Sequence, residues 1–221
     1  MGGQRTSSVI ANDGVENENS MLLVCLRSRW RQALQLELKH REGLPDALKV
    51  LLAEYPREGW ESSDNFGGLI QFWLERHMMF RKIMTALLNE SERGLDGNAE
   101  AQAVVSRISR YGSMLVGELH GHHNIEDMHY FPQLRLLDDR IAHGFDLLDS
   151  DHHALDGMIE TFTSSANDVI KAAMNGGRLE RELEGFRSSL IGFQRDLDRH
   201  LIDEEDLIVP VLLKHSPAGL V

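Results

Sequence analysis

Two stretches of the chain share one pattern, namely LHGHHNIEDMHYFP at residues 119–132 and LDRHLIDEEDLIVP at residues 197–210. In each stretch a glutamate follows a histidine by four residues, a second acidic residue comes next, and a proline stands ten residues after the histidine. Four residues along an α-helix rotate the side chain by about 40° and advance it by about 6 Å, so the histidine and the glutamate share a face. Each pair can therefore reach one metal ion.

Both histidine–glutamate pairs lie on apolar helix stripes. Leucine and phenylalanine precede the two histidines at helical spacing, at Leu115, Leu119, Leu190, Phe193 and Leu197. A single pair of this kind is more often a solvated ion pair on the protein surface. Two copies that face the core favour a metal site instead, because a buried, ionised glutamate needs a cation or a strong hydrogen-bond donor.

The remainder of the chain indicates helices. Apolar residues recur at helical spacing from residue 20 onward, and no alternating strand pattern is convincing. The spacing predicts four long helices at residues 66–90, 99–131, 145–174 and 179–209, with Pro132 and Pro210 ending the second and the fourth. It also predicts an earlier helix at residues 20–41 and a short one at 46–55. Four long amphipathic helices with short connections predict an all-α fold, an antiparallel four-helix bundle with an extra N-terminal helical segment.

Three segments are expected along the chain. Residues 1–19 are polar and acidic, which predicts a disordered leader and makes Met21 an alternative start to Met1. Residues 20–60 are too few to form a core of their own, so we expect them to pack on the bundle as a helical extension. Residues 61–215 are expected to form the metal-binding bundle.

The composition argues against several classes of protein. The chain of 221 residues has 23 Lys plus Arg against 35 Asp plus Glu, and this net charge of −12 disfavours nucleic-acid and anionic-membrane partners. Its single cysteine, Cys25, permits neither an internal disulfide nor a cysteine-based metal cluster. No apolar run approaches the roughly 18 residues of a membrane span and no signal peptide is recognisable, so a cytoplasmic location is expected.

Two further histidines stand on apolar stripes of the first and third long helices. His77 precedes His122 by 45 residues, and His152 precedes His200 by 48. The chain thus repeats a helix with one histidine followed by a helix with His-x-x-x-Glu. We predict that six side chains surround one cavity and bind a pair of metal ions, with two histidines on each metal and both glutamates bridging. These residues are His77, His122, Glu126, His152, His200 and Glu204.

The sequence also offers neighbouring polar residues as candidates. The stripe of His152 continues to Leu155, whereas His153 leads to Asp156, so His152 is the predicted ligand of its helix. His123 is as well suited to an outward position as to the second metal. Whether four residues join the metal shell is open from the sequence: His123, His129, Asp156 and Glu205.

These residues and their spacing resemble the hemerythrin-like, or HHE cation-binding, domains over roughly residues 66–212. The resemblance implies a non-heme di-iron site in a four-helix bundle that binds or senses a diatomic ligand, dioxygen or nitric oxide. Zinc or another divalent metal also suits these ligands. In the oxygen-carrying members a second histidine follows the third-helix ligand by four residues, where this chain has Asp156.

The resemblance leaves other functions open. The set of four histidines and two glutamates is closer to the di-iron proteins implicated in repairing iron–sulfur clusters, which carry a cysteine-containing N-terminal module where this chain has only Cys25. A di-iron oxidoreductase would need the same ligands, so the sequence does not separate a binding protein from an enzyme. A metal store or a scaffold with a vestigial site is the remaining alternative.

Overall fold

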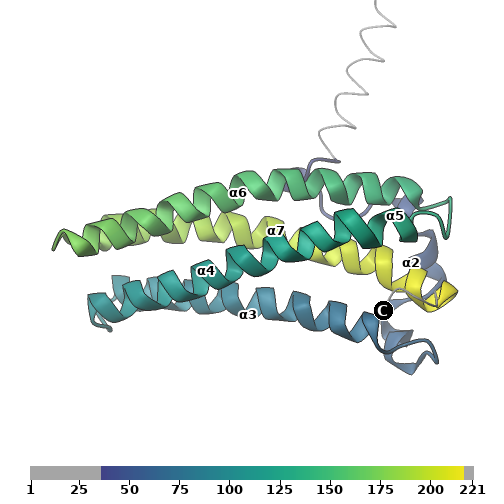
Figure 1. The fold of residues 1–221 in the computed structure, drawn as a ribbon, viewed down its shortest axis with the longest axis horizontal. Helices are drawn as coiled ribbons and strands as arrows, with labels where there is room; N and C mark the ends of the chain where they lie inside the picture. Colours follow the sequence, from purple (N-terminus) through teal and green to yellow (C-terminus); the bar gives the residue numbers. More distant parts are fainter. Residues whose placement is uncertain (1–35, 217–221) are drawn as a thin grey trace, which may run out of the picture.

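The computed structural model describes residues 36–216, which contain helices and no strand. The predicted leader at 1–19 and most of the predicted helix at 20–41 lie outside the described residues. Four long helices form the body of the molecule: α3 (Leu69–Leu95), α4 (Ala101–Ile125), α6 (Ala142–Met174) and α7 (Glu180–His215) (Figure 1). None of the helices in this described part is long and apolar enough to cross a membrane.

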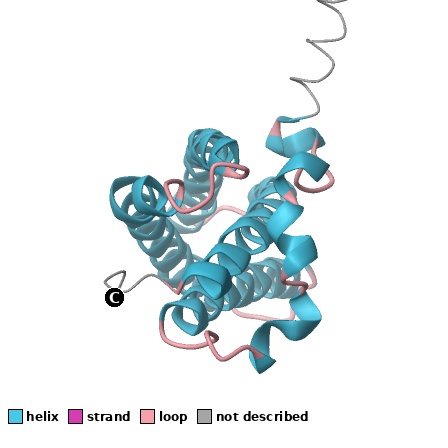
Figure 2. Ribbon diagram, turned by 90° about the vertical axis from the view of Figure 1, so that its right-hand side faces the viewer, coloured by secondary structure: helices cyan, strands magenta, loops and turns pink. Residues whose placement is uncertain are grey.

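The four long helices form an antiparallel bundle. Helix α3 packs against α4 and α7, and α6 packs against the same two helices. Figure 2 looks at the bundle from the end where the connection between α4 and α6 and the N-terminal segment lie. Short connections reverse the chain between α3 and α4 and between α6 and α7, and a longer one, residues 126–141, joins α4 to α6. The topology is that of an up-and-down bundle. The predicted all-α bundle is therefore confirmed.

Glycines with a left-handed backbone end two of the long helices. Gly97 follows α3 with a φ of 67°, and Gly176 follows α6 with a φ of 66°. After α6 the N–H of Gly177 donates to the carbonyl of Ala172 at 3.0 Å, and that of Gly176 to the carbonyl of Ala173 at 3.1 Å. These bonds use carbonyls that have no partner further along the helix, which explains why the chain turns here.

The prediction that proline ends the second and fourth long helices is wrong. Helix α7 continues through Pro210 to His215, although proline lacks the N–H that would bond four residues back and crowds that carbonyl. Residues 207–213 are all buried, and their apolar contacts outweigh the cost of the proline. In the second helix, Pro132 lies in the first turn of the short α5 (Phe131–Leu134), a position that proline favours.

A turn of π-helix, η4 (Glu126–Tyr130), joins α4 to α5. Hydrogen bonds in a π-helix span five residues instead of four, so one extra residue enters the turn. Such turns occur frequently at functional sites, and this one starts at a predicted metal ligand, Glu126.

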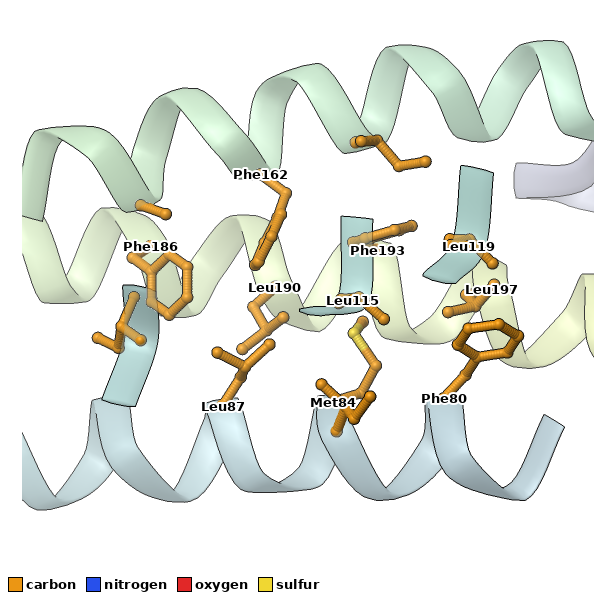
Figure 3. Close-up of a cluster of buried hydrophobic side chains, with 14 of the residues drawn as sticks. Phe80, Met84, Leu87, Leu115, Leu119, Phe162, Phe186, Leu190, Phe193 and Leu197 are labelled. Carbon is orange, nitrogen blue, oxygen red and sulfur yellow. The ribbon is translucent and has the colours of Figure 1, made fainter. Parts of the chain in front are cut away.

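The bundle has two apolar cores with a polar layer between them. The first fills the long shaft of the bundle, and Figure 3 shows Phe80, Leu115, Phe162 and Phe193 meeting there from all four helices. The second fills the other end, where Trp60 of the N-terminal segment joins residues of α3, α5, α6 and the last turns of α7. Along each long helix, the predicted metal-binding residues fall where one core gives way to the other.

The segment before the bundle consists of four short helical pieces: η1 (Leu38–His40), η2 (Asp46–Leu48), α2 (Val50–Glu54) and η3 (Arg57–Ser62). Three of them, η1, α2 and η3, pack on α7, and η2 packs on α2. The short helix predicted at 46–55 is thus divided, and η3 occupies part of a stretch without a predicted helix. The helix predicted at residues 20–41 does not extend to Arg41, whose backbone is extended with a ψ of 131°. We call residues 36–62 the N-terminal extension.

Candidate metal centre

The polar layer brings all six predicted residues together. His77 comes from α3, His122 from α4, Glu126 from the first position of η4, His152 from α6, and His200 and Glu204 from α7. One residue that the sequence left open, His123, joins them. None of the seven is more than 6% exposed. The repeat in the sequence therefore predicted a real juxtaposition of buried side chains.

The seven side chains form two groups. One ligand atom from each of His77, His122, Glu126 and Glu204 lies within 4.8 Å of the others, and the same holds for His123, His152 and His200. The glutamates also approach the second group, because Glu126 Oε2 lies 3.6 Å from His152 Nε2 and Glu204 Oε2 lies 3.4 Å from His200 Nε2. Two carboxylates thus lie between a pair of histidines and a trio, where the sequence predicted two pairs.

Unpartnered polar atoms are concentrated in this layer. Within the described residues, nine buried side-chain nitrogen or oxygen atoms have no hydrogen-bond partner, and seven of them belong to the two groups. They are both oxygens of Glu126, Oε2 of Glu204, Nε2 of His152, Nε2 of His200, and both ring nitrogens of His123. Each such atom costs about 1–3 kcal/mol when left unpaired, so the arrangement fits cations that would accept these lone pairs.

Three of the histidines are oriented by carboxylates on their outer side. Their Nδ1 atoms face carboxylate oxygens: His77 to Glu205 at 3.0 Å, His152 to Asp127 at 2.8 Å and His200 to Asp151 at 3.5 Å. A carboxylate accepts a hydrogen bond from Nδ1–H, and this leaves the lone pair of a neutral imidazole on Nε2, the atom that faces the layer. This is the arrangement by which proteins orient metal-binding imidazoles.

The sequence gave a signal for two of these carboxylates but not for the third. Asp127 and Glu205 are the acidic residues that follow the glutamate in both repeats. Asp151, however, reaches from α6 to a histidine on α7, 49 positions away in the chain. Sequence spacing alone does not reveal such a contact between helices.

The two glutamates are held differently. Trp73 donates its indole N–H to Glu204 Oε1 at 2.5 Å, a role that its position on an apolar stripe did not predict. Glu126 has no such donor: His122 Nε2 lies 3.0 Å from its Oε1 but is not oriented to form a hydrogen bond. Glu204 is therefore anchored in the bundle, whereas Glu126 is held only by its backbone and by packing.

The pKa values of the two glutamates shift in opposite directions. Burial raises the pKa of Glu126 well above its usual value, and repulsion from Glu204 raises it further. Burial acts on Glu204 in the same sense, but the adjacent His77, His200 and His122 outweigh it and hold its pKa well below the usual value. Before any cation binds, the surroundings thus favour the protonated form of Glu126 and the ionised form of Glu204.

The histidines divide in the same way. Burial lowers the pKa of His200, but the adjacent carboxylates of Asp151 and Glu204 outweigh burial and raise it to about 9. Burial also lowers the pKa of His77, but the adjacent Glu204 and Glu205 outweigh burial and raise this pKa above its usual value. Burial and repulsion from neighbouring imidazoles outweigh the attraction of Glu204 and lower the pKa of His122 to about 3. A cation entering the layer would therefore displace protons from His77, His200 and Glu126.

The remaining candidates lie outside the two groups. His153 is exposed and His152 is buried, as the stripe argument predicts. His129 is exposed, and Asp156 is an exposed neighbour of His120. Glu205 contacts His77 from the outer side. Of the four residues that the sequence left open, only His123 reaches the layer.

Apolar and aromatic side chains enclose the layer. The ring of Phe80 lies 5.2 Å from that of His122, and the ring of Phe131 lies 5.4 Å from that of His152. Trp73 packs edge-on against His122. Along α3, Trp73 lies one turn before His77 and Phe80 lies one turn after it. These walls lower the local dielectric, which strengthens the attraction between a bound cation and its carboxylates.

The sequence matches the family model described as the hemerythrin HHE cation-binding domain over residues 68–212, which is more than half of the chain. No curated protein and no solved structure matches it. The match includes all seven side chains of the polar layer, and their two groups are of a kind that can hold metal ions. The chain belongs to the hemerythrin HHE cation-binding domain family.

Proposed function

We propose that this chain binds two iron ions and takes up or senses a diatomic ligand, dioxygen or nitric oxide. The observation that carries the proposal is the placement of two carboxylates between two groups of histidines inside a buried core. Two cations held a few ångströms apart repel strongly at low dielectric, and shared anions offset that repulsion. Glu126 and Glu204 are the residues that we assign as bridges.

We assign His77 and His122 to one iron and His123, His152 and His200 to the other. His123 stacks on His152 with ring centroids 4.0 Å apart, and both of its nitrogens lack partners. It can take the place of the histidine that oxygen-carrying relatives have four residues after the third-helix ligand, where Asp156 is exposed in this chain. Five imidazoles with two carboxylates suit iron, and no thiolate from the described residues competes.

When bound, the iron pair would supply reversible electron transfer and coordination positions for a diatomic ligand. The residues of the chain control access to that chemistry. Phe80, Phe131 and Trp73 exclude bulk water, so small apolar molecules are favoured over polar substrates. Asp127, Asp151 and Glu205 hold the imidazoles in place, so that little rearrangement is needed when iron enters.

The test is to purify the chain without oxygen, load it with ferrous iron, and measure iron per chain together with the visible spectrum. We expect two irons per chain and a spectrum that changes on exposure to dioxygen or nitric oxide and recovers when the gas is removed. His152→Ala should lose iron, while the matched variant His153→Ala should retain it. Failure of the wild-type chain to retain two irons, or a spectrum that does not respond to either gas, would contradict the proposal.

A further inference from the structure

Two arginines of the N-terminal extension reach the outer side of the metal centre. Both lie before residue 68, where the match to the family model begins. Arg41 contacts Asp151, whose other neighbour is His200. Arg57 contacts Glu205, which also contacts His77. Through Asp151, Arg41 thus connects the extension to His200, which belongs to the group of three histidines. Through Glu205, Arg57 connects it to His77, which belongs to the other group.

The contact through Arg41 is buried and has several hydrogen bonds. Arg41 is 7% exposed, and its guanidinium bonds both oxygens of Asp151, with Nη1 3.1 Å from Oδ1. Its Nε donates to Asp203 Oδ2 at 2.8 Å. Asp203 also accepts from Arg199, which donates in turn to the backbone carbonyl of Glu42 at 2.8 Å. This network fixes the plane of the Asp151 carboxylate, and with it the direction of the His200 ring.

A network of this kind is a costly way to hold an extension in place. Buried ion pairs contribute little to stability compared with apolar residues of similar volume, because both charges lose their hydration. The extension already has apolar anchors in Leu44, Leu51 and Trp60. Positioning of a ligand is a role that apolar residues could not fill, whereas a bidentate guanidinium holds a carboxylate at a set orientation.

The contact through Arg57 is similar but weaker. Arg57 Nη1 donates to Glu205 Oε2 at 2.9 Å, and Glu205 Oε1 lies 3.0 Å from His77 Nδ1. The Arg57 side chain is 39% exposed, and Arg81 of α3 also donates to Glu205 at 2.9 Å. Loss of Arg57 therefore leaves Glu205 with Arg81 as a second guanidinium donor, whereas loss of Arg41 leaves Asp151 with the His200 ring alone as its side-chain partner among the described residues.

We propose that the extension is part of the metal centre, with Arg41 as the positioning residue of His200 and Arg57 as an auxiliary positioning residue of His77. The proposal rests on the proposed function, because it presumes that these histidines bind metal. It adds that the family domain alone supplies the ligands but not the charges that orient them. Retention of the metal ion bound by His123, His152 and His200 should therefore depend on a segment outside the matched domain.

The experiment uses the full chain loaded with Co²⁺, whose paramagnetism shifts the NMR signals of bound histidines. The rate at which a chelator removes cobalt is measured for the wild type and for Arg41→Gln, Arg41→Lys and Arg57→Gln. We expect Arg41→Gln to release one of the two ions about 10–100 times faster and to shift or lose the signal of the His200 Nδ1–H proton. Arg41→Lys should restore part of the retention, and Arg57→Gln should have the smallest effect.

The matched control is Glu54→Gln. Glu54 also joins the extension to the bundle, through Arg140 at 2.8 Å, but it contacts none of the metal-centre residues. It should leave cobalt release unchanged, so an equal effect in Glu54→Gln would mean that any loosening of the extension suffices and would overturn the proposal.

Wild-type release rates and signals in both Arg41 variants would also overturn the proposal, while the proposed function would stand. If Arg41→Gln does not fold, Arg41→Lys is compared with Glu54→Gln, and cobalt release that is no faster in Arg41→Lys would overturn the proposal. Failure of the wild type to bind cobalt or iron would instead remove the proposed function.

Discussion

The two repeats place the same residue pattern in different surroundings. In the second repeat, Glu204 lies in a regular helix, accepts a hydrogen bond from Trp73, and is flanked by Asp203 and Glu205, which are paired with arginines. In the first repeat, Glu126 opens a π turn and has no hydrogen-bond donor. A shared motif therefore predicts which residues meet, but not how firmly each is held. We infer that the hydrogen bonds around Glu204 hold it in place without metal, whereas Glu126 depends on a bound cation to favour its ionised form and fix its position.

The largest difference is expected between the isosteric variants Glu204→Gln and Glu126→Gln in metal-free protein. Glu204→Gln removes the negative charge that pairs with His77 and His200 and raises their pKa values. Because this leaves buried positive charge without its partner, it should lower the free energy of unfolding by about 3–5 kcal/mol. Glu126→Gln should change it by less than about 1 kcal/mol, because the raised pKa of Glu126 favours its neutral form and its carboxyl oxygens have no hydrogen-bond partner to lose. Urea denaturation measures both values, and equal losses would mean that the two glutamates are equivalent.

The pH dependence of stability should be opposite in sign to that of metal affinity. His200 has a pKa of about 9 in the folded protein against about 6.5 when unfolded, so its contribution, about 3 kcal/mol, is complete below pH 6.5 and lost as the pH rises through 9. The folded state disfavours the ionised form of Glu126, whose pKa is raised, so this residue also makes the folded protein less stable as the pH rises. The melting temperature of metal-free protein should therefore fall from pH 6.5 to 9.

Metal affinity should rise over the same pH range, because the cation displaces protons from His77, His200 and Glu126. The increase in melting temperature caused by added metal should accordingly grow with pH. His200→Gln serves as the control, and its metal-free stability should depend less on pH. A metal-free protein that becomes more stable between pH 6.5 and 9 would contradict the assignment of protons to these groups.

A smaller effect is expected from Trp73→Phe, which removes the donor to Glu204 but keeps an aromatic side chain in the core. The lost hydrogen bond to an ionised carboxylate should cost about 1.5–3 kcal/mol of metal-free stability and should speed iron release. Trp60→Phe is the matched control, since the Trp60 indole donates to the backbone carbonyl of Tyr55 at 2.8 Å, away from the metal centre. It should cost about 1 kcal/mol and leave iron release unchanged. Similar iron release in the two variants would show that Trp73 is a packing residue only.

The bundle and the six predicted residues were accessible from the sequence because both depend on local periodicity. A stripe of leucine and phenylalanine fixes which face of a helix is buried, and a histidine on that face must enter the core. The position of Glu126 at the start of a π turn did not follow from this periodicity, nor did the continuation of α7 beyond Pro210. In the second case, burial across the bundle outweighed a local preference that favours ending the helix.

The parts that the sequence did not predict depend on contacts between distant segments. His123 stands one residue, or about 100° of rotation, from His122, so the stripe argument could not place it in the core. Arg41 and Asp151 meet from positions 110 residues apart. No spacing rule connects such residues, because their approach is set by how the helices and the extension pack. Six of the seven inner residues were therefore predictable, whereas His123, Asp151 and Arg41 depend on packing between segments that no spacing rule connects.

The most direct test of the account is the number of irons bound per chain in Glu126→Ala, Glu204→Ala and His77→Ala, each loaded without oxygen beside the wild type. If the two glutamates are shared between the irons, each glutamate variant should lose both ions and most of the metal-dependent rise in melting temperature, while His77→Ala should mainly lose one. The steep loss is expected because repulsion between the cations is no longer balanced once a bridge is removed. Retention of two irons per chain, with the full rise in melting temperature, in either glutamate variant would contradict the bridging assignment.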